Sequence, residues 1–441
     1  RARPSFQALP RAMGRLASRP ATRSTAPRRG TRPLPWVGAH AAAPPASMTL
    51  APAETALILP GGGARAAYQV GALRALARLT PRGRPLPFPV LCGTSAGAIN
   101  AVTLAAHADD FRLGVARLVR WWRRVRTGDV YDTDLAQLSR HGMRWLAGVL
   151  TGRPGPDEAA SMLDNGALGG LLRDAIDFGR IDANLRSGAL HAVAVNATSY
   201  STGFAITFFQ AQPSAAPWRR TRREGRVTML GVDHLLASTA IPFVFPAVRL
   251  GDDWYMDGSV RQLTPLSPAL HLGARRVLVL SIGQFAGQRA NSHEQPRYPS
   301  FAQTAGHALS TVFLDNLGAD LERLHQLNRL ASVVPTDELA RRGIRLGHVD
   351  AFVLAPSRDL GEMAMGYASR LPAGVRYLMR GFGSTQGTGA NLTSYLLFEP
   401  GYVRTLLKLG YADAMARRDE LDAFLHAGGA RYLPLSPGDR A

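Results

Sequence analysis

One short segment, residues 89–100, constrains the fold of this chain more than any other. An apolar run leads into a Gly-x-Ser-x-Gly motif at Gly93–Gly97, with Thr94 and Ala96 as its variable residues, and an apolar, alanine-rich run follows. This order predicts a strand, a very tight turn and a helix, with Ser95 at the apex. Glycines on both sides let the strand and the helix approach closely while the backbone is strained. The Ser95 hydroxyl would then stand at the positive end of a helix, where it can attack an acyl carbon.

A glycine-rich stretch lies between the first expected strand and the first expected helix. Residues 54–60 predict a short buried strand, and residues 64–79 predict a helix with one apolar face. The connecting residues are Gly61, Gly62, Gly63, Ala64 and Arg65. Glycines at a helix N-terminus allow backbone N–H groups to converge on an anion. In a serine acyl hydrolase, that anion is the tetrahedral oxyanion.

The same glycines also fit Gly-x-Gly-x-x-Ala, a fingerprint of dinucleotide binding. Such a site needs an acidic residue about 20 positions further on, which binds the ribose. No Asp or Glu occurs between Glu54 and Asp109, and the second expected strand ends in the serine turn. The sequence therefore disfavours NAD, whereas an arginine-based NADP site stays open. A phosphate-binding P-loop is excluded because no Gly-Lys-Ser/Thr follows.

Asp257 is a candidate carboxylate for the same site. It follows an expected strand at residues 254–256 and precedes Gly258 and Ser259, which suits a carboxylate directed from a sharp turn. A turn or capping aspartate is the alternative interpretation. Asp252 and Asp253, in the preceding Gly-Asp-Asp turn, are expected to be solvated.

Residues 237–246 contain two prolines and two phenylalanines. They predict a rigid, apolar loop that either walls an acyl-chain pocket or serves as a buried connector.

Residues 218–223 form the densest basic cluster of the sequence. We interpret this cluster as a solvated loop, with contact to anionic head groups as the alternative.

The remaining pattern predicts an α/β protein with a parallel sheet covered by helices. Helical and loop-rich sequence, including Trp121, Trp122 and Trp145, occupies residues 111–187, and helical sequence returns at 396–425. Further strands are expected at 190–197, 204–210, 277–282 and 349–354.

Composition narrows the class of protein further. The formal charge is +20, but residues 1–47 hold nine arginines and no acid, and 43 basic and 32 acidic residues remain after them. We interpret residues 1–47 as disordered or non-native sequence.

The single cysteine, Cys92, fits a reducing, cytoplasmic setting and is expected to be a buried, inert thiol. No apolar run approaches the ~20 residues of a membrane span, and nucleic-acid binding rests on charge alone.

Four motifs in order resemble those of the patatin-like phospholipase family. They are the glycine-rich oxyanion loop with its arginine at 61–65, the serine elbow at 93–97, the Ala-Ser-x-Ala-x-Pro-x-x-Phe-Pro segment at 237–246, and the aspartate motif at 257–259. Pro60 and Ala66 stand where the family has Asp and Gly. Ala66 adds only a methyl group, so we expect the loop to persist.

The resemblance implies a three-layer α/β/α fold with a mainly parallel central sheet. It implies a catalytic domain at 55–285 and a helix-rich C-terminal region at 290–441 whose role stays open. Ser95 would be the nucleophile of a Ser–Asp dyad and Asp257 its proton acceptor, with residues 61–65 as the oxyanion hole and no metal or cofactor. The implied substrate is a phospholipid or another acyl lipid, with transient peripheral contact at the membrane.

Two alternatives stay open. An ordinary α/β-hydrolase would use a histidine base, and His271 follows Asp257 in the chain order Ser…Asp…His. His271 lies in an expected helix, where a structural role is favoured. The other alternative is a non-catalytic lipid-binding module on the same fold.

Overall fold

The computed structural model describes residues 54–132, 161, 163–262, 265–283, 317–335, 338, 341–342, 347–376 and 393–426. The expectations for residues 1–47 and for Trp145 lie outside the described residues. All of the structure discussed below belongs to one compact unit, Leu50–Ala441.

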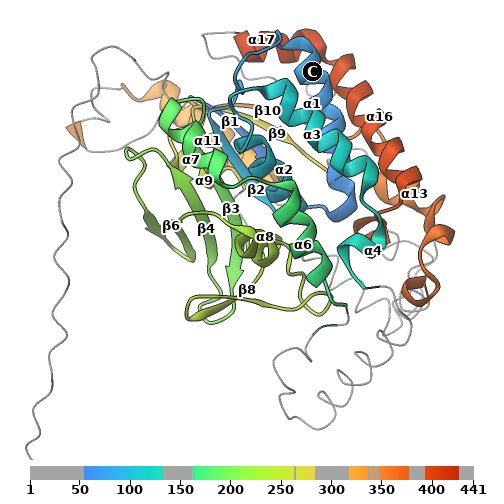
Figure 1. The fold of residues 1–441 in the computed structure, drawn as a ribbon. Helices are drawn as coiled ribbons and strands as arrows, with labels where there is room; N and C mark the ends of the chain where they lie inside the picture. The colour runs from blue at the N-terminus through green and yellow to red at the C-terminus, as the bar shows by residue number, and fades with distance from the viewer. Residues whose placement is uncertain are drawn as a thin grey trace, which may run out of the picture. The chain divides into compact units, whose positions relative to one another are not determined.

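One sheet runs through this unit in the order β10-β9-β1-β2-β3-β4-β6-β5, and β8 and β7 extend from β3 (Figure 1). Its strands are β1 (Thr55–Leu59), β2 (Val90–Thr94), β3 (Ala192–Ser199), β4 (Ala205–Ala211), β5 (Trp218–Arg220), β6 (Arg223–Val227), β7 (Val248–Leu250), β8 (Asp253–Asp257), β9 (Arg276–Leu280) and β10 (Asp350–Leu354).

The centre of the sheet is parallel. Strands β10, β9, β1, β2 and β3 all pair in parallel, whereas β4 and β8 both run antiparallel to β3. Leu59 pairs with Gly93, so the loops that follow β1 and β2 leave the same edge of the sheet. The prediction of a mainly parallel central sheet is confirmed. Ligand sites of parallel sheets lie at this carboxyl edge.

Side chains alternate between two cores, one on each face of the sheet. On β1, Leu57 and Leu59 join the larger core, while Ala56 and Ile58 join the smaller one. This alternation follows from the two-residue period of a strand. The continuous apolar run of β1 is therefore explained by burial on both faces.

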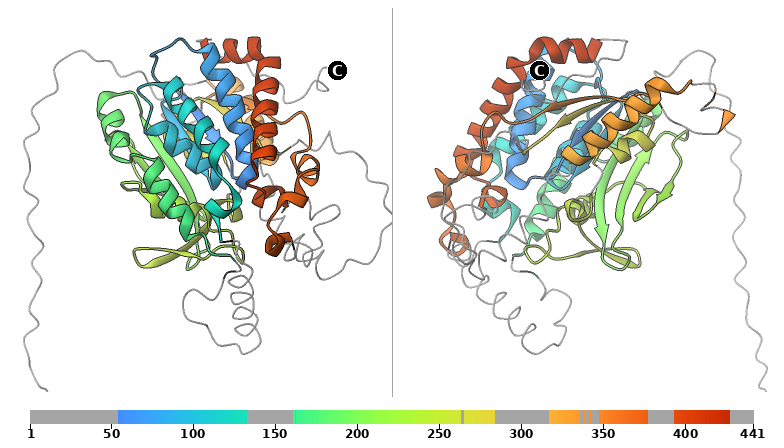
Figure 2. Two further views of the ribbon diagram at one scale, coloured as in Figure 1. Left: turned by 45° about the vertical axis from the view of Figure 1, so that its right-hand side comes forward. Right: turned by 180° about the vertical axis from the view of Figure 1, so that it is seen from behind.

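Helices cover both faces of the sheet and form the outer two layers. The larger core receives α1 (Ala67–Leu79), α2 (Ala96–Ala105), α3 (Phe111–Arg124) and α16 (Pro400–Ala416). The smaller core receives α9 (Ser267–His271) and α11 (Leu317–Val333), and α11 is seen crossing this face from behind (Figure 2). The three-layer α/β/α prediction is confirmed. The other helices are α4 (Thr127–Val130), α6 (Gly166–Ala175), α7 (Gly179–Ser187), α8 (Val232–Thr239), α13 (Leu360–Met365) and α17 (Arg418–His426).

The C-terminal helix α16 packs directly on α1. A Cβ atom built on Gly410 would lie 2.0 Å from the Tyr68 carbonyl oxygen, and one on Gly71 would lie 2.4 Å from that of Leu407. A larger residue at either position would push the two helix backbones apart. The helical span expected at 396–425 is two helices, because α16 and α17 are separated at Arg417.

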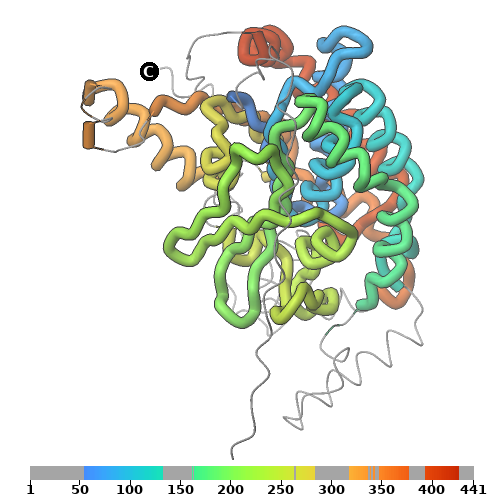
Figure 3. The backbone as a smooth tube through the Cα atoms, turned by 60° about the vertical axis from the view of Figure 1, so that its left-hand side comes forward, coloured from blue at the N-terminus to red at the C-terminus, as the bar shows by residue number. Residues whose placement is uncertain are grey.

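The interpretation of residues 218–223 as a solvated loop is wrong. Strands β5 and β6 form an antiparallel hairpin on the edge that Figure 3 brings forward, and β6 pairs with β4. The hairpin is held by Trp218, whose ring stacks on Phe209 at 4.9 Å and on His271 at 4.9 Å. Arg219, Arg220 and Arg222 are exposed. The solvent-exposed positive charge was therefore expected correctly, whereas the hairpin backbone was not. Among the described residues, no helix is long and apolar enough to cross a membrane.

Candidate active site

Ser95 stands at the apex of a sharp turn between β2 and α2. Its backbone has φ 53° and ψ −130°, a region that residues with a side chain rarely adopt. The turn is tight because α2 packs on the end of β1: a Cβ atom on Gly97 would lie 2.1 Å from the Leu59 carbonyl oxygen. The structure thus places Ser95 at the N-terminus of α2, where the helix dipole favours negative charge.

A second serine, Ser238 of the 237–246 motif, braces this turn, whereas the prediction from that motif concerned only its apolar residues. Ser238 of α8 accepts a hydrogen bond from the Ser95 backbone N–H at 2.8 Å and donates one to the Asn196 carbonyl at 2.6 Å. Asn196 in turn donates from its side chain to the Gly93 carbonyl at 3.2 Å and to the Thr94 hydroxyl at 3.1 Å. All of these groups are buried. The strained backbone of the turn is therefore fixed by hydrogen bonds from β3 and α8.

The glycine-rich loop folds into a short 3₁₀ turn, Gly63–Ala66, beside Ser95. A Cβ atom on Gly61 would lie 3.0 Å from Ser95 Cβ and 2.5 Å from Ser259 Oγ, so this loop, the serine turn and the aspartate motif meet. Within the described chain, none of the N–H groups of residues 61–64 has a hydrogen-bond acceptor. Four N–H donors beside a serine, without an acceptor among the described residues, suit an anion.

Arg65 differs from the other residues of the loop. Its backbone N–H donates to the Gly62 carbonyl at 3.0 Å, so it closes the turn. Its side chain is buried, donates from Nε to Ser394 Oγ at 2.6 Å, and lies over the Tyr395 ring at 4.7 Å. The arginine therefore ties the loop to the C-terminal part of the chain.

Asp257 ends β8 and is fully buried beside the serine turn. Its strand pairs with the end of β3, where Asp257 lies opposite Ala197, and its backbone N–H donates to the Ala240 carbonyl at 2.8 Å. One carboxylate oxygen, Oδ1, accepts the Ser259 N–H at 2.8 Å. The other, Oδ2, is buried and has no well-formed hydrogen bond with any described residue.

The environment of Asp257 shifts its proton affinity toward that of a base. Burial raises the pKa of this carboxyl from 3.8 to about 6, against the lowering effect of hydrogen bonding from Ser95 and Ser259. The Ser95 hydroxyl is thus close enough to the carboxylate to influence its pKa, although it does not make a well-formed bond to Oδ2. The neighbouring Asp253 is not simply solvated as expected, because it accepts a hydrogen bond from Ser199 at 2.6 Å.

A small apolar cavity of about 30 Å³ adjoins Ser95. It is lined by residues that include Ile99, Trp121, Phe245 and Tyr395. Of the two phenylalanines in the 237–246 segment, only Phe245 belongs to this wall, since Phe243 is 59% exposed. The segment is also not all loop, because its first residues end α8.

A larger cavity of about 350 Å³ lies behind the same wall. Ile99 and Trp121 line both cavities, so they separate them. The larger cavity is lined on the far side by Leu171, Leu172 and Ile176. Together the two cavities run from Ser95 along one side of α3.

The comparison with protein families gives one match, over residues 57–270, to the model described as patatin-like phospholipase. Residues 57–270 therefore resemble a patatin-like phospholipase domain. The match contains the glycine-rich loop, the serine turn and the aspartate motif. No curated protein matches the chain.

Two of the similar solved structures are human GIVD cytosolic phospholipase A2 in complex with methyl gamma-linolenyl fluorophosphonate, one of them also with terbium chloride. They are 12% and 11% identical to this chain, each with a TM-score of 0.36 over 84% of it. The alignments cover 58% and 59% of those proteins, so this chain spans less than two thirds of their length.

Residues beyond the family match close one side of the patatin-like site. Gly63 has φ 51°, and a Cβ atom there would lie 2.2 Å from the Tyr395 carbonyl oxygen. Leu396 and Phe398 line the cavity at Ser95, and Phe398 stacks on Trp122 at 6.1 Å. The C-terminal segment is thus part of the wall, whereas the domain boundary near residue 285 stays a prediction.

A buried polar network lies behind the glycine-rich loop. Gln69 donates to the Pro60 carbonyl at 2.9 Å and accepts from the Asn100 side chain at 3.0 Å. Asn100 accepts from the Trp122 indole N–H at 2.8 Å. Because Gln69, Asn100 and Trp122 are all fully buried, the network fixes the entry of the loop from three helices. Sequence spacing could have suggested only that these residues share buried helix faces.

His271 and Cys92 lie apart from these groups. The His271 ring contacts the Ser267 carbonyl at 2.8 Å and stacks on Trp218, and burial holds its pKa below the ordinary value. Cys92 belongs to the smaller core, and burial raises the pKa of its thiol to about 12, as expected for an inert cysteine. In the described ranges, no three His, Cys, Asp or Glu side chains cluster as metal ligands do.

Proposed function

We propose that this chain hydrolyses ester bonds of acyl lipids through a Ser95–Asp257 dyad. The observation that carries the proposal is the buried Asp257 carboxylate, which lies close enough to the serine of a strained turn for that serine to influence its pKa, and whose Oδ2 has no hydrogen-bond partner among the described residues. A buried carboxylate oxygen without a hydrogen bond costs free energy, and a role in the reaction would explain why the cost is kept. Its raised pKa suits a general base that works near neutral pH.

In the first half of the reaction, Asp257 accepts the Ser95 hydroxyl proton while the serine oxygen attacks the ester carbon. The carbonyl oxygen becomes an oxyanion, which the N–H groups of residues 61–64 stabilise by hydrogen bonds. The tetrahedral intermediate then expels the alcohol, which takes the proton back from Asp257. The product of this half is an acyl group esterified to Ser95.

In the second half, a water molecule takes the place of the alcohol. Asp257 accepts a proton from the water as its oxygen attacks the acyl carbon. Collapse of the second oxyanion breaks the bond to Ser95, which recovers the proton from Asp257, and the fatty acid leaves. The dyad ends in its starting protonation state.

The apolar cavity beside Ser95, together with the apolar side of the larger cavity, supplies the place for the acyl chain. At about 30 Å³, the cavity beside Ser95 holds about one water molecule, so an acyl chain enters only when the wall of Ile99 and Trp121 moves. The chain then reaches the larger cavity along α3. The apolar cavity at the nucleophile favours a lipid substrate over a small polar ester.

A lipid panel tests the proposal directly. Purified chain should release fatty acid from at least one of phosphatidylcholine, phosphatidylglycerol, lysophospholipid or acylglycerol, detected by mass spectrometry. A folded chain that hydrolyses none of these lipids, nor a short-chain ester, would identify a non-catalytic lipid-binding module instead.

Replacement of His271 by alanine should leave hydrolysis within a few-fold of the wild-type rate, because this ring contacts Ser267 and Trp218 and none of the reacting groups. Stability should fall, since Trp218 loses its stacking partner. The measurement is kcat/KM on a soluble ester, with thermal unfolding alongside. Loss of nearly all activity in a folded His271→Ala chain would instead favour an α/β-hydrolase triad.

A further inference from the structure

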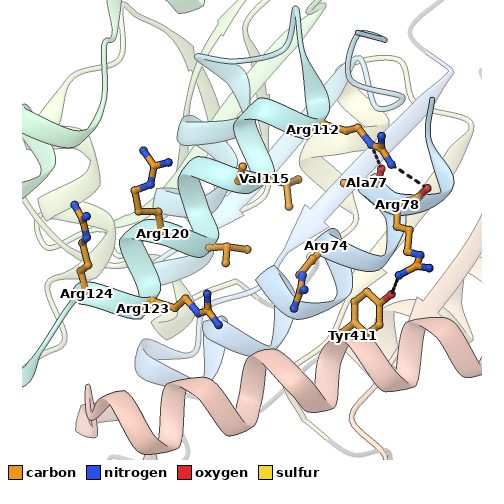
Figure 4. Close-up of a pocket in the computed structure, with 11 residues that line it drawn as sticks. Arg74, Ala77, Arg78, Arg112, Val115, Arg120, Arg123, Arg124 and Tyr411 are labelled. Atoms are coloured by element: carbon orange, nitrogen blue, oxygen red, sulfur yellow. Dashed lines mark hydrogen bonds between the residues drawn. The ribbon is translucent and has the colours of Figure 1, made fainter. Parts of the chain in front are cut away.

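An arginine-lined hollow of about 600 Å³ lies between α1, α3 and α16, away from the proposed reacting groups (Figure 4). We propose that this surface, here called the arginine groove, docks the chain on anionic phospholipid bilayers. The inference rests on the proposed function, because it identifies the protein surface that would bind the membrane holding the lipid substrate. Its six arginines are Arg74, Arg78, Arg112, Arg120, Arg123 and Arg124.

The positive charge of the groove is not neutralised within the described chain. None of its six arginines forms an ion pair with a described residue, and neither α1 nor α3 contains an acidic residue. Of the acids close by, Asp109 pairs with Arg180, Asp110 caps α3, and Asp413 bonds to Tyr68 and Ser357. Asp129 and Asp174 line the larger cavity with Arg120 and Arg124, and neither forms an ion pair with a described residue. Six guanidinium groups around one hollow, none with an acidic partner in the described chain, therefore favour an anionic ligand.

Three of the six arginines are held around the hollow by contacts with the neighbouring helices. Arg74 lies over the Tyr411 ring at 5.2 Å, and Arg78 donates to the Tyr411 hydroxyl at 3.2 Å. Arg112 donates to the Ala77 carbonyl at 2.6 Å. Figure 4 shows Arg74 and Arg123 reaching into the space between the helices. These contacts use only part of each side chain and leave donors for phosphate oxygens.

The basic surface extends beyond the hollow, which favours a bilayer over a single small anion. Arg404 and Lys408 are exposed and precede Tyr411 on the same side of α16, by the spacing of a helix. Arg117 is exposed on α3, and Leu113, one turn before it, is 42% exposed. A small anion needs two or three of these cations, whereas a bilayer presents many phosphates at once.

The position of the groove links it to the proposed site. Helix α3 separates the groove from the larger cavity, and Arg120 and Arg124 line both. The same helix supplies Trp121 and Trp122 to the cavity at Ser95. A bilayer bound along α3 would therefore hold its lipids next to the path that leads to Ser95.

The test measures binding to vesicles by sedimentation, with all variants in a Ser95→Ala background so that no lipid is consumed. The vesicles are phosphatidylcholine alone or mixed with phosphatidylglycerol. The groove variant is Arg74→Gln, Arg78→Gln and Arg123→Gln. Its matched control removes the same charge from the β5–β6 hairpin: Arg219→Gln, Arg220→Gln and Arg222→Gln. A third variant, with lysine at the three groove positions, keeps the charge.

The groove variant should bind mixed vesicles at least about tenfold more weakly, since each arginine near an anionic surface contributes several-fold. The hairpin control should bind within about twofold of the parent chain, and the lysine variant should bind nearly as well. Added salt should weaken binding by the parent chain. Equal losses in the groove and hairpin variants would overturn the proposal, as would equal binding to neutral vesicles.

Two further outcomes would also overturn it. One is groove-dependent binding of soluble glycerophosphoglycerol without groove-dependent binding of vesicles, which would indicate a small-molecule site. The other is groove-dependent binding of RNA with none to vesicles. Hydrolysis of a soluble ester is measured separately, with Ser95 intact. That assay tests the proposed hydrolase function, whereas vesicle binding tests the proposed docking surface, so the two proposals can fail independently.

Discussion

Replacement of Ser95 by alanine should abolish ester hydrolysis, with a loss on the order of 10⁴–10⁶-fold in kcat. The reason is that no other hydroxyl occupies the apex of the β2–α2 turn, so the acyl-enzyme has no alternative attachment point. The loss should appear in kcat, because the cavities and the donors of residues 61–64 still bind the substrate. The measurements are fatty acid release and the mass of an acyl or phosphonyl adduct, which the wild-type chain should form and the variant should not.

Two other variants make the Ser95 result specific. Ser95→Gly should be equally inactive but more stable than Ser95→Ala by about 1 kcal/mol, since glycine adopts a φ of 53° without strain. Ser187→Ala, on the exposed surface of α7, should keep full activity. If the Ser95→Ala chain still formed the covalent adduct, another residue would be the nucleophile and the proposed mechanism would be wrong.

The elements at the carboxyl edge of the sheet were predictable because their signals are local. Strand β1, the glycine-rich turn, strand β2 and helix α2 follow one another within residues 55–105, and each is bounded by glycine, proline or the serine turn. Burial on both faces makes the strands continuous apolar runs. The expected positions of β3, β4, β9 and β10 agree with the structure to within about two residues for the same reason.

What the sequence missed depends on contacts between distant parts of the chain. The β5–β6 hairpin has exposed arginines and little apolar alternation, and it is held by Trp218 against Phe209 and His271. The closure of the glycine-rich loop by Ser394 and Tyr395 joins residues some 330 positions apart. The role of Ser238 also depends on such a contact, because helix α8 lies next to the serine turn although the two are far apart in the sequence. Sequence spacing carries no signal for contacts of this kind.

Replacement of Asp257 by asparagine should lower kcat/KM at least about 10³-fold, because an amide cannot accept the Ser95 proton. In the wild-type chain, kcat/KM should rise with pH around the Asp257 pKa of about 6, as the carboxylate becomes a base. The variant should show no such rise. The measurement is the pH dependence of kcat/KM on a soluble ester between pH 4 and 8.

The same substitution should stabilise the folded chain at neutral pH. The pKa of Asp257 is about 6 when folded and near its ordinary value of 3.8 when unfolded, so the folded state binds the proton more tightly. The stability that this group contributes is fully present below about pH 3.8 and is lost as the pH rises through 6. An asparagine side chain carries no charge to bury, so the variant should exceed wild type by about 3 kcal/mol at pH 8, at ~1.4 kcal/mol per pKa unit.

Asp253, on the same strand, provides the matched control with the opposite sign. Partial burial alone would raise its pKa, but hydrogen bonds from Ser199, Ser201 and the Trp254 N–H outweigh burial and hold the pKa below its ordinary value. Its contribution to stability is therefore present at neutral pH and lost in acid, so Asp253→Asn should destabilise the chain at pH 8, and this effect should shrink as the pH falls below 3.8. Urea unfolding across this pH range measures both variants. If the Asp257→Asn chain were less stable than wild type at pH 8, the Asp257 carboxylate would stabilise the fold. Its burial would then not be a loss of stability that only catalysis explains.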